Sequence, residues 1–418
     1  MNTWRVEKHG WHPDRLPQHN SIFTICNGYW ALKGLLLEDR GAILPTTIVN
    51  GVYDLCNMFA TIPPSKEKRW YLEEDHFDKG APSPSVANLP SPVHVRAFVD
   101  GVELCVQRGV IEDFTQALDL RDAVYTYSYV YTDEHGRRTR IEMARFCDAT
   151  AWHVAHLRYT LTPLNYSARL RLVSGIDGAV RSNVVGDVQL DVTGMRLLPR
   201  RGCLLAARTR DRRIDVQVAI RNAVSVKNAR RRALLESARI AEEFDIRLTQ
   251  GVPVTLEKQM VICTSEDARH GVDADVTAEL AHAARRGFTS ALRAHSDQWR
   301  TWWQRADVVI SGDDLAQLYL RFCLHHLIAA APKHTDKLSV PVKLLTGEYY
   351  QGNTFYDTDT YIVPFYTHVM PQWSRACLQW RHLGLEPARA IARAQGYRGA
   401  KFAWQAGPYG EECLGQWW

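Results

Sequence analysis

The spacing of apolar residues changes once along the chain, near position 270, and this change limits the folds that the sequence can adopt. From about residue 20 to 265, short runs alternate between apolar and polar positions, with turn signals such as Asn27-Gly28 and Asp100-Gly101 between them. A period of two predicts strands buried on one face, and an Asp-Gly pair between two such runs predicts a hairpin. Many short strands without intervening helices favour a large antiparallel sandwich over a parallel sheet.

Beyond about residue 270, apolar residues recur at helical spacing and the β-turn signals disappear. The first part of this region predicts two linker helices that end near Asp307. Further helices are expected at 315–331, 358–370, 371–383 and 386–396. Helices and loops that alternate at this pace are typical of a helical barrel or solenoid, and the sequence has no fixed-period repeat.

We divide the chain into a β-sandwich domain (1–270), a helical linker (271–312) and the start of a helical barrel (313–418). The last section has only about 100 residues, enough for four or five helices of typical length, whereas a closed barrel of paired helices needs more. The sequence also ends on two tryptophans directly after a loop, although termini are usually polar. We therefore expect a multidomain β plus α protein whose barrel is incomplete, as the N-terminal portion of a longer chain.

Composition excludes several classes of function. At 46% hydrophobic and 23% charged residues, the composition is that of an ordinary soluble globular protein. The net charge is only +5, and acidic residues follow closely on the basic runs at 208–213 and 229–239, which predicts solvated faces rather than a nucleic-acid groove. The N-terminus lacks an apolar signal segment, and no run approaches the roughly 18 apolar residues that span a membrane. We expect a cytoplasmic protein without nucleic-acid or membrane partners.

The spacing of cysteines and histidines gives no sign of a metal site. The nine cysteines are scattered without a CxxC pair, so neither a zinc site nor a disulfide framework is indicated. His325 and His326 are neighbours on a predicted helix and point to different faces of it. We interpret both as core or capping residues rather than as metal ligands.

The loop KLLTGEYYQGNTFYDTDTY (343–361) places carboxylates among aromatic rings. Aromatic faces combined with carboxylates that accept hydroxyl hydrogen bonds suit a pocket for a sugar. The alternative is a helix start, with Asp357 or Thr358 as its cap and Asp359 complementing the helix dipole. The residues alone leave both interpretations open.

A second loop, FAWQAGPYGEEC (402–413), has similar composition. Trp404 could stack on a sugar ring, and Glu411 and Glu412 could serve as acids. Adjacent glutamates more often lie in a solvated turn, which is the interpretation we favour for this pair.

The order of these motifs resembles glycoside hydrolase family 65, which contains maltose, trehalose and kojibiose phosphorylases and their hydrolase relatives. Individual motifs are short, but their number and order cover nearly the whole chain. The matching segments include CNGYWALKG (26–34), LPTTIVNGVYD (44–54), NLPSPVHVRAFVDG (88–101), LTGEYYQGNTFYDTDTYIVPFY (345–366) and GYRGAKFAWQAGPYGEEC (396–413).

The resemblance implies an N-terminal β-sandwich, helical linkers and an (α/α)6 catalytic barrel. It also implies cleavage of α-glucosidic bonds with inversion, either by inorganic phosphate, which gives β-glucose 1-phosphate, or by water in the hydrolase relatives. The aromatic–Asp pair that binds glucose in the family falls on Tyr356 and Asp357, with Asp359 at a glutamate position. The implied substrate-binding residues are Tyr356, Asp357, Asp359, Glu348, Trp404 and Gln405. Tyrosine in place of tryptophan, and aspartate in place of glutamate, put the precise sugar in doubt.

An inverting cleavage needs a general acid that protonates the leaving oxygen. The family supplies a glutamate from a Gly-Pro-Asp-Glu-Tyr type segment, which does not occur in these 418 residues, so we expect the acid beyond Trp418. The leading hypothesis is an inverting phosphorylase of a trehalose, maltose or kojibiose type disaccharide. Phosphate is its co-substrate, it needs no cofactor, and a homodimer is carried over from the family. The alternatives are a trehalase-like hydrolase of the same family and a non-catalytic carbohydrate-binding remnant.

Overall fold

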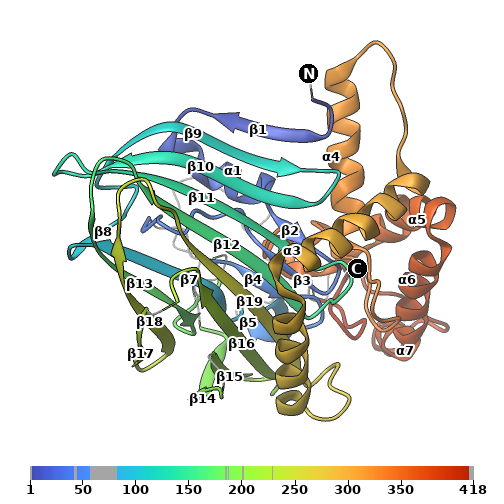
Figure 1. Cartoon of the computed structure of the whole chain (residues 1–418). Helices are drawn as coiled ribbons and strands as arrows, with labels where there is room; N and C mark the ends of the chain where they lie inside the picture. The colour runs from blue at the N-terminus through green and yellow to red at the C-terminus, as the bar shows by residue number, and fades with distance from the viewer. Residues whose placement is uncertain are drawn as a thin grey trace, which may run out of the picture.

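The computed structural model describes residues 2–41, 45–56, 82–183, 186, 188–199, 202–227 and 229–413. Strands gather at one side of the molecule and the C-terminal helices at the other, as Figure 1 shows. The five terminal residues 414–418, including Trp418, lie outside the described residues, as does Leu44 of the second matching segment.

Two antiparallel sheets form most of the N-terminal half and confirm the predicted sandwich. The larger, nine-stranded sheet has the order β1 (Arg5–His9), β9 (Val110–Asp119), β10 (Val124–Thr132), β11 (Arg138–Cys147), β12 (Val154–Pro163), β19 (Val254–Thr264), β16 (Asp215–Val224), β15 (Cys203–Thr209) and β14 (Leu190–Leu197). The five-stranded sheet has the order β17 (Arg230–Leu235), β18 (Arg239–Leu248), β13 (Ala168–Asp177), β7 (Ser91–Val99) and β8 (Val102–Glu103). One apolar core joins the inner faces of both sheets.

Three smaller sheets lie beside the sandwich or between the loops. They consist of β2 (Ile25–Cys26), β3 (Trp30–Leu32) and β4 (Thr47–Val49); β5 (Tyr53–Cys56) and β6 (Ser83–Val86); and β20 (Thr354–Phe355) and β21 (Gln405–Ala406). The predicted hairpin at Asp100-Gly101 is confirmed: β7 pairs with β8, and both turn residues have left-handed φ angles, 46° and 88°. This conformation explains the glycine at the second position.

The helices follow the predicted positions closely. Two short N-terminal elements are η1 (Pro13–Arg15) and α1 (Leu16–Ile22). The two predicted linker helices appear as one element, α3 (Val272–Ala306), that is broken at Gly287 and ends directly before Asp307. The C-terminal elements are α4 (Asp314–Ala330), η3 (Tyr349–Gly352), the π-helical η4 (Thr358–Ile362), α5 (Val363–Val369), α6 (Pro371–Leu383) and α7 (Leu385–Ala394). Within the described ranges, no helix combines the length and apolar character that a membrane crossing requires.

Helix α3 lies along the outer face of the nine-stranded sheet (Figure 1). Its apolar residues Val276, Leu280 and Ala283 pack against strand residues such as Val154 and Val261. The amphipathic pattern of α3 therefore covers a sheet face that would otherwise expose apolar side chains to water.

A cluster of aromatic side chains joins the sandwich to the helices. The Trp4 and Trp303 rings meet edge to face with centroids 5.0 Å apart, and Trp302 contacts Trp373 of α6 at 5.8 Å. His325 stacks on Trp299 at 4.8 Å, and both His325 and His326 are buried, which confirms their interpretation as core residues.

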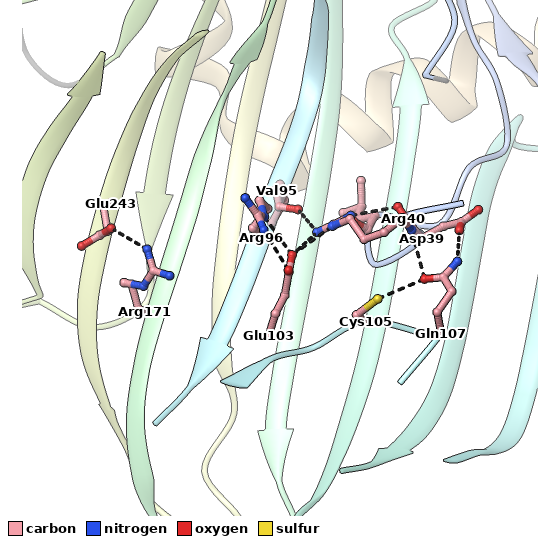
Figure 2. Close-up of polar contacts among 10 residues, drawn as sticks. Asp39, Arg40, Val95, Arg96, Glu103, Cys105, Gln107, Arg171 and Glu243 are labelled. Carbon is pink, nitrogen blue, oxygen red and sulfur yellow. Dashed lines mark hydrogen bonds and ion pairs between the residues drawn. The ribbon is translucent and has the colours of Figure 1, made fainter. Parts of the chain in front are cut away.

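An ion network in which Glu103 is buried and both arginines are partly exposed ties the segment before residue 41 to the five-stranded sheet (Figure 2). Glu103 of β8 accepts hydrogen bonds from Arg40 Nε at 2.9 Å and from Arg96 Nε at 2.8 Å. Arg40 also donates to the Leu37 carbonyl at 2.7 Å. Burial alone would raise the pKa of Glu103, but the two guanidinium groups outweigh it and lower the pKa to about 2.

We expect Glu103→Gln to lower the free energy of unfolding at pH 7 by about 1–3 kcal/mol, because it leaves two guanidinium groups without their anion. Since the folded pKa of Glu103 is depressed, its stabilisation is complete above about pH 4.5 and is lost as the pH falls toward 2. The stability difference between the wild type and the variant should therefore shrink across this window. Urea unfolding at several pH values measures it, with the exposed Glu134→Gln as the matched control.

Candidate functional site

Two loops that are distant in sequence meet at the candidate site because short strands join them. Strand β20 pairs antiparallel with β21, so that Phe355 lies opposite Gln405. The Tyr356 and Trp404 rings then meet edge to face with centroids 5.6 Å apart. The Tyr356 hydroxyl donates to the Phe402 carbonyl at 2.7 Å, which fixes the tyrosine ring. The structure thus brings together two aromatic residues that the sequence placed in separate motifs.

The turn before β20 has an unusual backbone. Tyr350 and Gln351 have φ angles of 53° and 58°, in the left-handed region that non-glycine residues rarely occupy. Gln405 Nε2 donates to Gln351 Oε1 at 2.7 Å, and the Tyr53 hydroxyl of β5 donates to the Gly352 carbonyl. Surrounding contacts thus hold a strained turn next to the aromatic pair, a combination typical of functional sites.

Asp357 stands at the start of the helix that follows β20, and its side chain is exposed. It makes no side-chain capping bond, and Thr358 donates its hydroxyl to the Val340 carbonyl at 2.8 Å instead of capping. The helix-cap alternative for both residues is therefore wrong. Among the residues that the structure describes, no hydrogen bond or ion pair engages the Asp357 carboxylate, which leaves it free for a ligand. The following turn, η4, is a π-helix, an element that often marks functional sites.

Asp359 lies two residues farther on and has a protein partner. Its carboxylate pairs with Arg381 in the last turn of α6. The guanidinium of Arg381 also lies 5.7 Å from the Tyr356 ring centroid and 4.8 Å from that of Trp380. Our sequence reasoning missed Arg381, because a basic residue at a helix C-terminus usually only complements the dipole. The contact between α5 and α6 and the pairing with Asp359 place Arg381 at the site.

Glu348 is directed at the sandwich. Its side chain is buried, and Oε2 accepts from the Asn183 backbone N–H at 2.9 Å and from Asn183 Nδ2 at 3.1 Å. Burial raises the pKa of Glu348, while the hydrogen bonds from Asn183 and the charge of Lys33 oppose that rise. In the described chain, no contact joins this carboxylate to Tyr356 or Trp404. Glu348 thus anchors the 343–361 loop to Asn183 of the sandwich.

The pair Glu411 and Glu412 is not a solvated turn, and that prediction was wrong. Glu412 accepts hydrogen bonds from the backbone N–H groups of Trp404, at 2.8 Å, and Gln405, at 3.2 Å. Glu411 pairs with Arg212 of the sandwich and accepts from the Tyr409 N–H at 2.9 Å. Both carboxylates hold the second loop in shape, because orphan backbone donors need acceptors where the chain has left regular structure.

Models of one protein family match two parts of the chain. Residues 6–302 match the glycosyl hydrolase family 65 N-terminal domain, and residues 321–418 match the glycosyl hydrolase family 65 central catalytic domain. Similar curated proteins include kojibiose phosphorylase of Thermoanaerobacter brockii, at 26% identity over 100% of this chain and 52% of the relative. The alpha,alpha-trehalose phosphorylase of the same organism is 24% identical over 99% of this chain and 54% of the relative.

The same arrangement occurs in a solved structure. A candidate kojibiose phosphorylase from the human microbiome superimposes with a TM-score of 0.87 at 19% identity, covering 99% of this chain and 53% of that chain. This likeness shows the shared fold. The chain spans about half the length of the curated relatives that it matches. With both family models on the chain in order, the first over residues 6–302, the chain belongs to glycosyl hydrolase family 65.

Proposed function

We propose that the chain is part of an inverting α-glucoside phosphorylase that converts an α-linked glucose disaccharide and inorganic phosphate into β-glucose 1-phosphate and a released sugar. The observation that carries the proposal is the exposed Asp357 carboxylate, which has no partner among the described residues, beside the Tyr356–Trp404 ring pair. A carboxylate accepts hydrogen bonds from sugar hydroxyls, and aromatic faces pack against the apolar faces of the ring. The kojibiose and trehalose phosphorylases among the relatives support this reaction class.

The candidate residues have different roles in this proposal. Tyr356, Asp357 and Trp404 contact the glucosyl unit directly. Asp359 holds Arg381, which lies near the Tyr356 ring. Gln405 joins the two loops through Gln351, and Glu348 ties the first loop to Asn183 of the sandwich. The general acid comes from a glutamate beyond Trp418, and phosphate is the attacking group, so that no metal or organic cofactor takes part.

We also propose the domain division 1–270, 271–312 and 313–418. The end of β19 at Thr264 and the starts of α3 at Val272 and α4 at Asp314 support these limits. A cytoplasmic location and a homodimer complete the proposal for the whole protein.

The test is phosphorolysis by the protein of the complete reading frame. Trehalose, maltose, kojibiose and nigerose are offered with and without inorganic phosphate, and glucose 1-phosphate and free glucose are both measured. We expect glucose 1-phosphate to form from one of these disaccharides only when phosphate is present. Free glucose released at the same rate without phosphate would instead establish the hydrolase alternative. Sugar binding without turnover of any disaccharide would establish the binding remnant.

A further inference from the structure

A cavity of about 220 Å³ lies between the sandwich and the helices. Six segments form its walls: Tyr29 of the β2–β3 turn, the turn at 50–51, the loop at 264–267, the loop at 334–338, the end of α6 at 380–384, and residues 408–409. None of the candidate substrate-binding residues lines it. The cavity is thus a feature separate from the Tyr356–Trp404 site.

Cross-domain contacts hold these walls in place. Trp380 Nε1 donates to the Pro408 carbonyl at 2.8 Å, which fixes the last loop against α6. The Tyr409 hydroxyl donates to Glu266 Oε2 at 3.3 Å, and the Arg212 guanidinium lies 5.2 Å from the Tyr409 ring centroid. Because the loop is tied to both domains, the cavity is formed before any ligand arrives.

The charges around the cavity nearly balance. Asp267 pairs with His153 Nε2 at 2.6 Å and accepts from the Thr264 backbone N–H at 3.1 Å. Burial would lower the pKa of His153, but the hydrogen bonds and charges of Asp267 and Glu279 prevail and raise the pKa to about 9, so an imidazolium lies between two carboxylates at neutral pH. Lys337 and Glu266, which carry opposite charges, both line the cavity. With one carboxylate in excess nearby, an anionic ligand is disfavoured, and a neutral ligand meets little net charge.

The cavity also places polar side chains beside apolar ring faces. His334 lines it, and Nδ1 of this ring, which is buried from solvent, has no hydrogen-bond partner in the described structure. Burial lowers the pKa of His334 to about 4, so the ring is neutral at pH 7. Tyr409 lines the opening with half of its surface exposed, at 50%, and Trp380 closes one wall. Rings with a few convergent donors and acceptors are the surroundings that bind a polyhydroxylated molecule.

We propose that this interdomain cavity binds a neutral polyol of the size of a monosaccharide, at a site distinct from the substrate-binding residues. Only one layer of side chains separates the two sites, because Arg381 contacts both Trp380 and the Asp359 carboxylate. The polyol contacts the Tyr409 ring, while its hydroxyls bond to Glu266 and to His334.

Equilibrium dialysis of labelled glucose against the complete protein tests the proposal, with the Asp357→Ala variant as the starting protein so that the other site is weakened. We expect this variant to retain one class of glucose binding. Adding Tyr409→Ala should weaken that binding about tenfold, by loss of the ring face, and Glu266→Ala should weaken it as well. The matched control is Tyr319→Ala, which removes a tyrosine of similar exposure, 61% against 50% for Tyr409, from α4.

Two results would overturn the inference: no glucose binding in the Asp357→Ala protein, or binding that Tyr409→Ala and Glu266→Ala leave unchanged. Thermal melting of each variant checks that the fold is intact. The outcome is separable from the proposed function. Phosphorolysis that survives Asp357→Ala would contradict the role of Asp357, while the Tyr409-dependent binding would still stand.

Discussion

Replacing Asp357 with alanine should lower kcat/KM for phosphorolysis by the complete enzyme about 10²-fold or more. The carboxylate is exposed, caps no helix and has no protein partner in the described chain, so its removal leaves the protein's own contacts intact. What is lost is a set of charge-assisted hydrogen bonds to the glucosyl unit. With them goes the alignment of the anomeric carbon with the attacking phosphate.

Steady-state kinetics on the disaccharide that the panel identifies measures this effect. Asp14→Ala is the matched control, since Asp14 is an exposed aspartate in η1 of the sandwich. We expect the control to change kcat/KM by less than about twofold, as for other surface substitutions. A decrease below about threefold for Asp357→Ala, with an unchanged melting temperature, would remove Asp357 from the substrate-binding residues.

Gly28→Ala should be the most destabilising of the glycine substitutions at the junction of the two domains. Gly28 lies in the β2–β3 turn with a φ of 91°, where a side chain is already strained. A Cβ there would stand 2.0 Å from the Ala331 carbonyl oxygen at the end of α4. Backbone atoms lie on both sides of this clash, so the domain contact itself would have to open.

Hydrogen bonds on both sides of Gly28 prevent the backbone from moving away from the added methyl group. Asn27 holds the turn by accepting from the Trp30 N–H at 3.2 Å and donating to the Asp148 carbonyl at 2.9 Å. On the other side, Lys333 caps α4 by donating to the Ala329 carbonyl at 3.0 Å. Overpacking and backbone strain together should lower the free energy of unfolding by about 3 kcal/mol or more.

Urea unfolding followed by tryptophan fluorescence measures the loss, because the Trp302–Trp373 contact reports on the same junction. Gly136→Ala is the control: its φ is 71°, but a Cβ there meets nothing within 4 Å. Its free energy of unfolding should therefore fall only by the strain of a left-handed alanine, about 1–2 kcal/mol. Equal losses for the two variants would show that the domain contact accommodates a methyl group and that the junction is less rigid than its packing implies.

The sequence pattern predicted the strands and helices well because each of them is caused by residues close together in the chain. Alternation of apolar residues reflects a strand with one buried face, and the helical period reflects a helix with one apolar stripe. The Asp100-Gly101 hairpin and the helix ends near Asp307 and Leu383 follow from turn chemistry within a few residues. The family resemblance likewise rests on short motifs in order, and the family models confirm it.

The site was harder to predict because its contacts join residues that no local pattern connects. Glu412 was expected in water, but it accepts hydrogen bonds from the Trp404 and Gln405 N–H groups at the start of β21. The capping role considered for Asp357 was reasonable for an aspartate at a helix start, yet the π-helical turn leaves its carboxylate unused. The geometry of segments distant in sequence decides which carboxylate has a protein partner and which has none among the described residues.

The sequence by itself therefore determined the β-to-helix order, the turns, the family and the positions of Tyr356 and Asp357. These depend on short-range periodicity, on the φ preferences of glycine and on motif order. Only the tertiary structure decided that Tyr356 meets Trp404, that Arg381 pairs with Asp359, and that a cavity with apolar ring faces and a few polar groups lies between the domains. The reason is physical: the partner of a charged or aromatic side chain is set by long-range packing, which brings together residues that the chain itself keeps far apart.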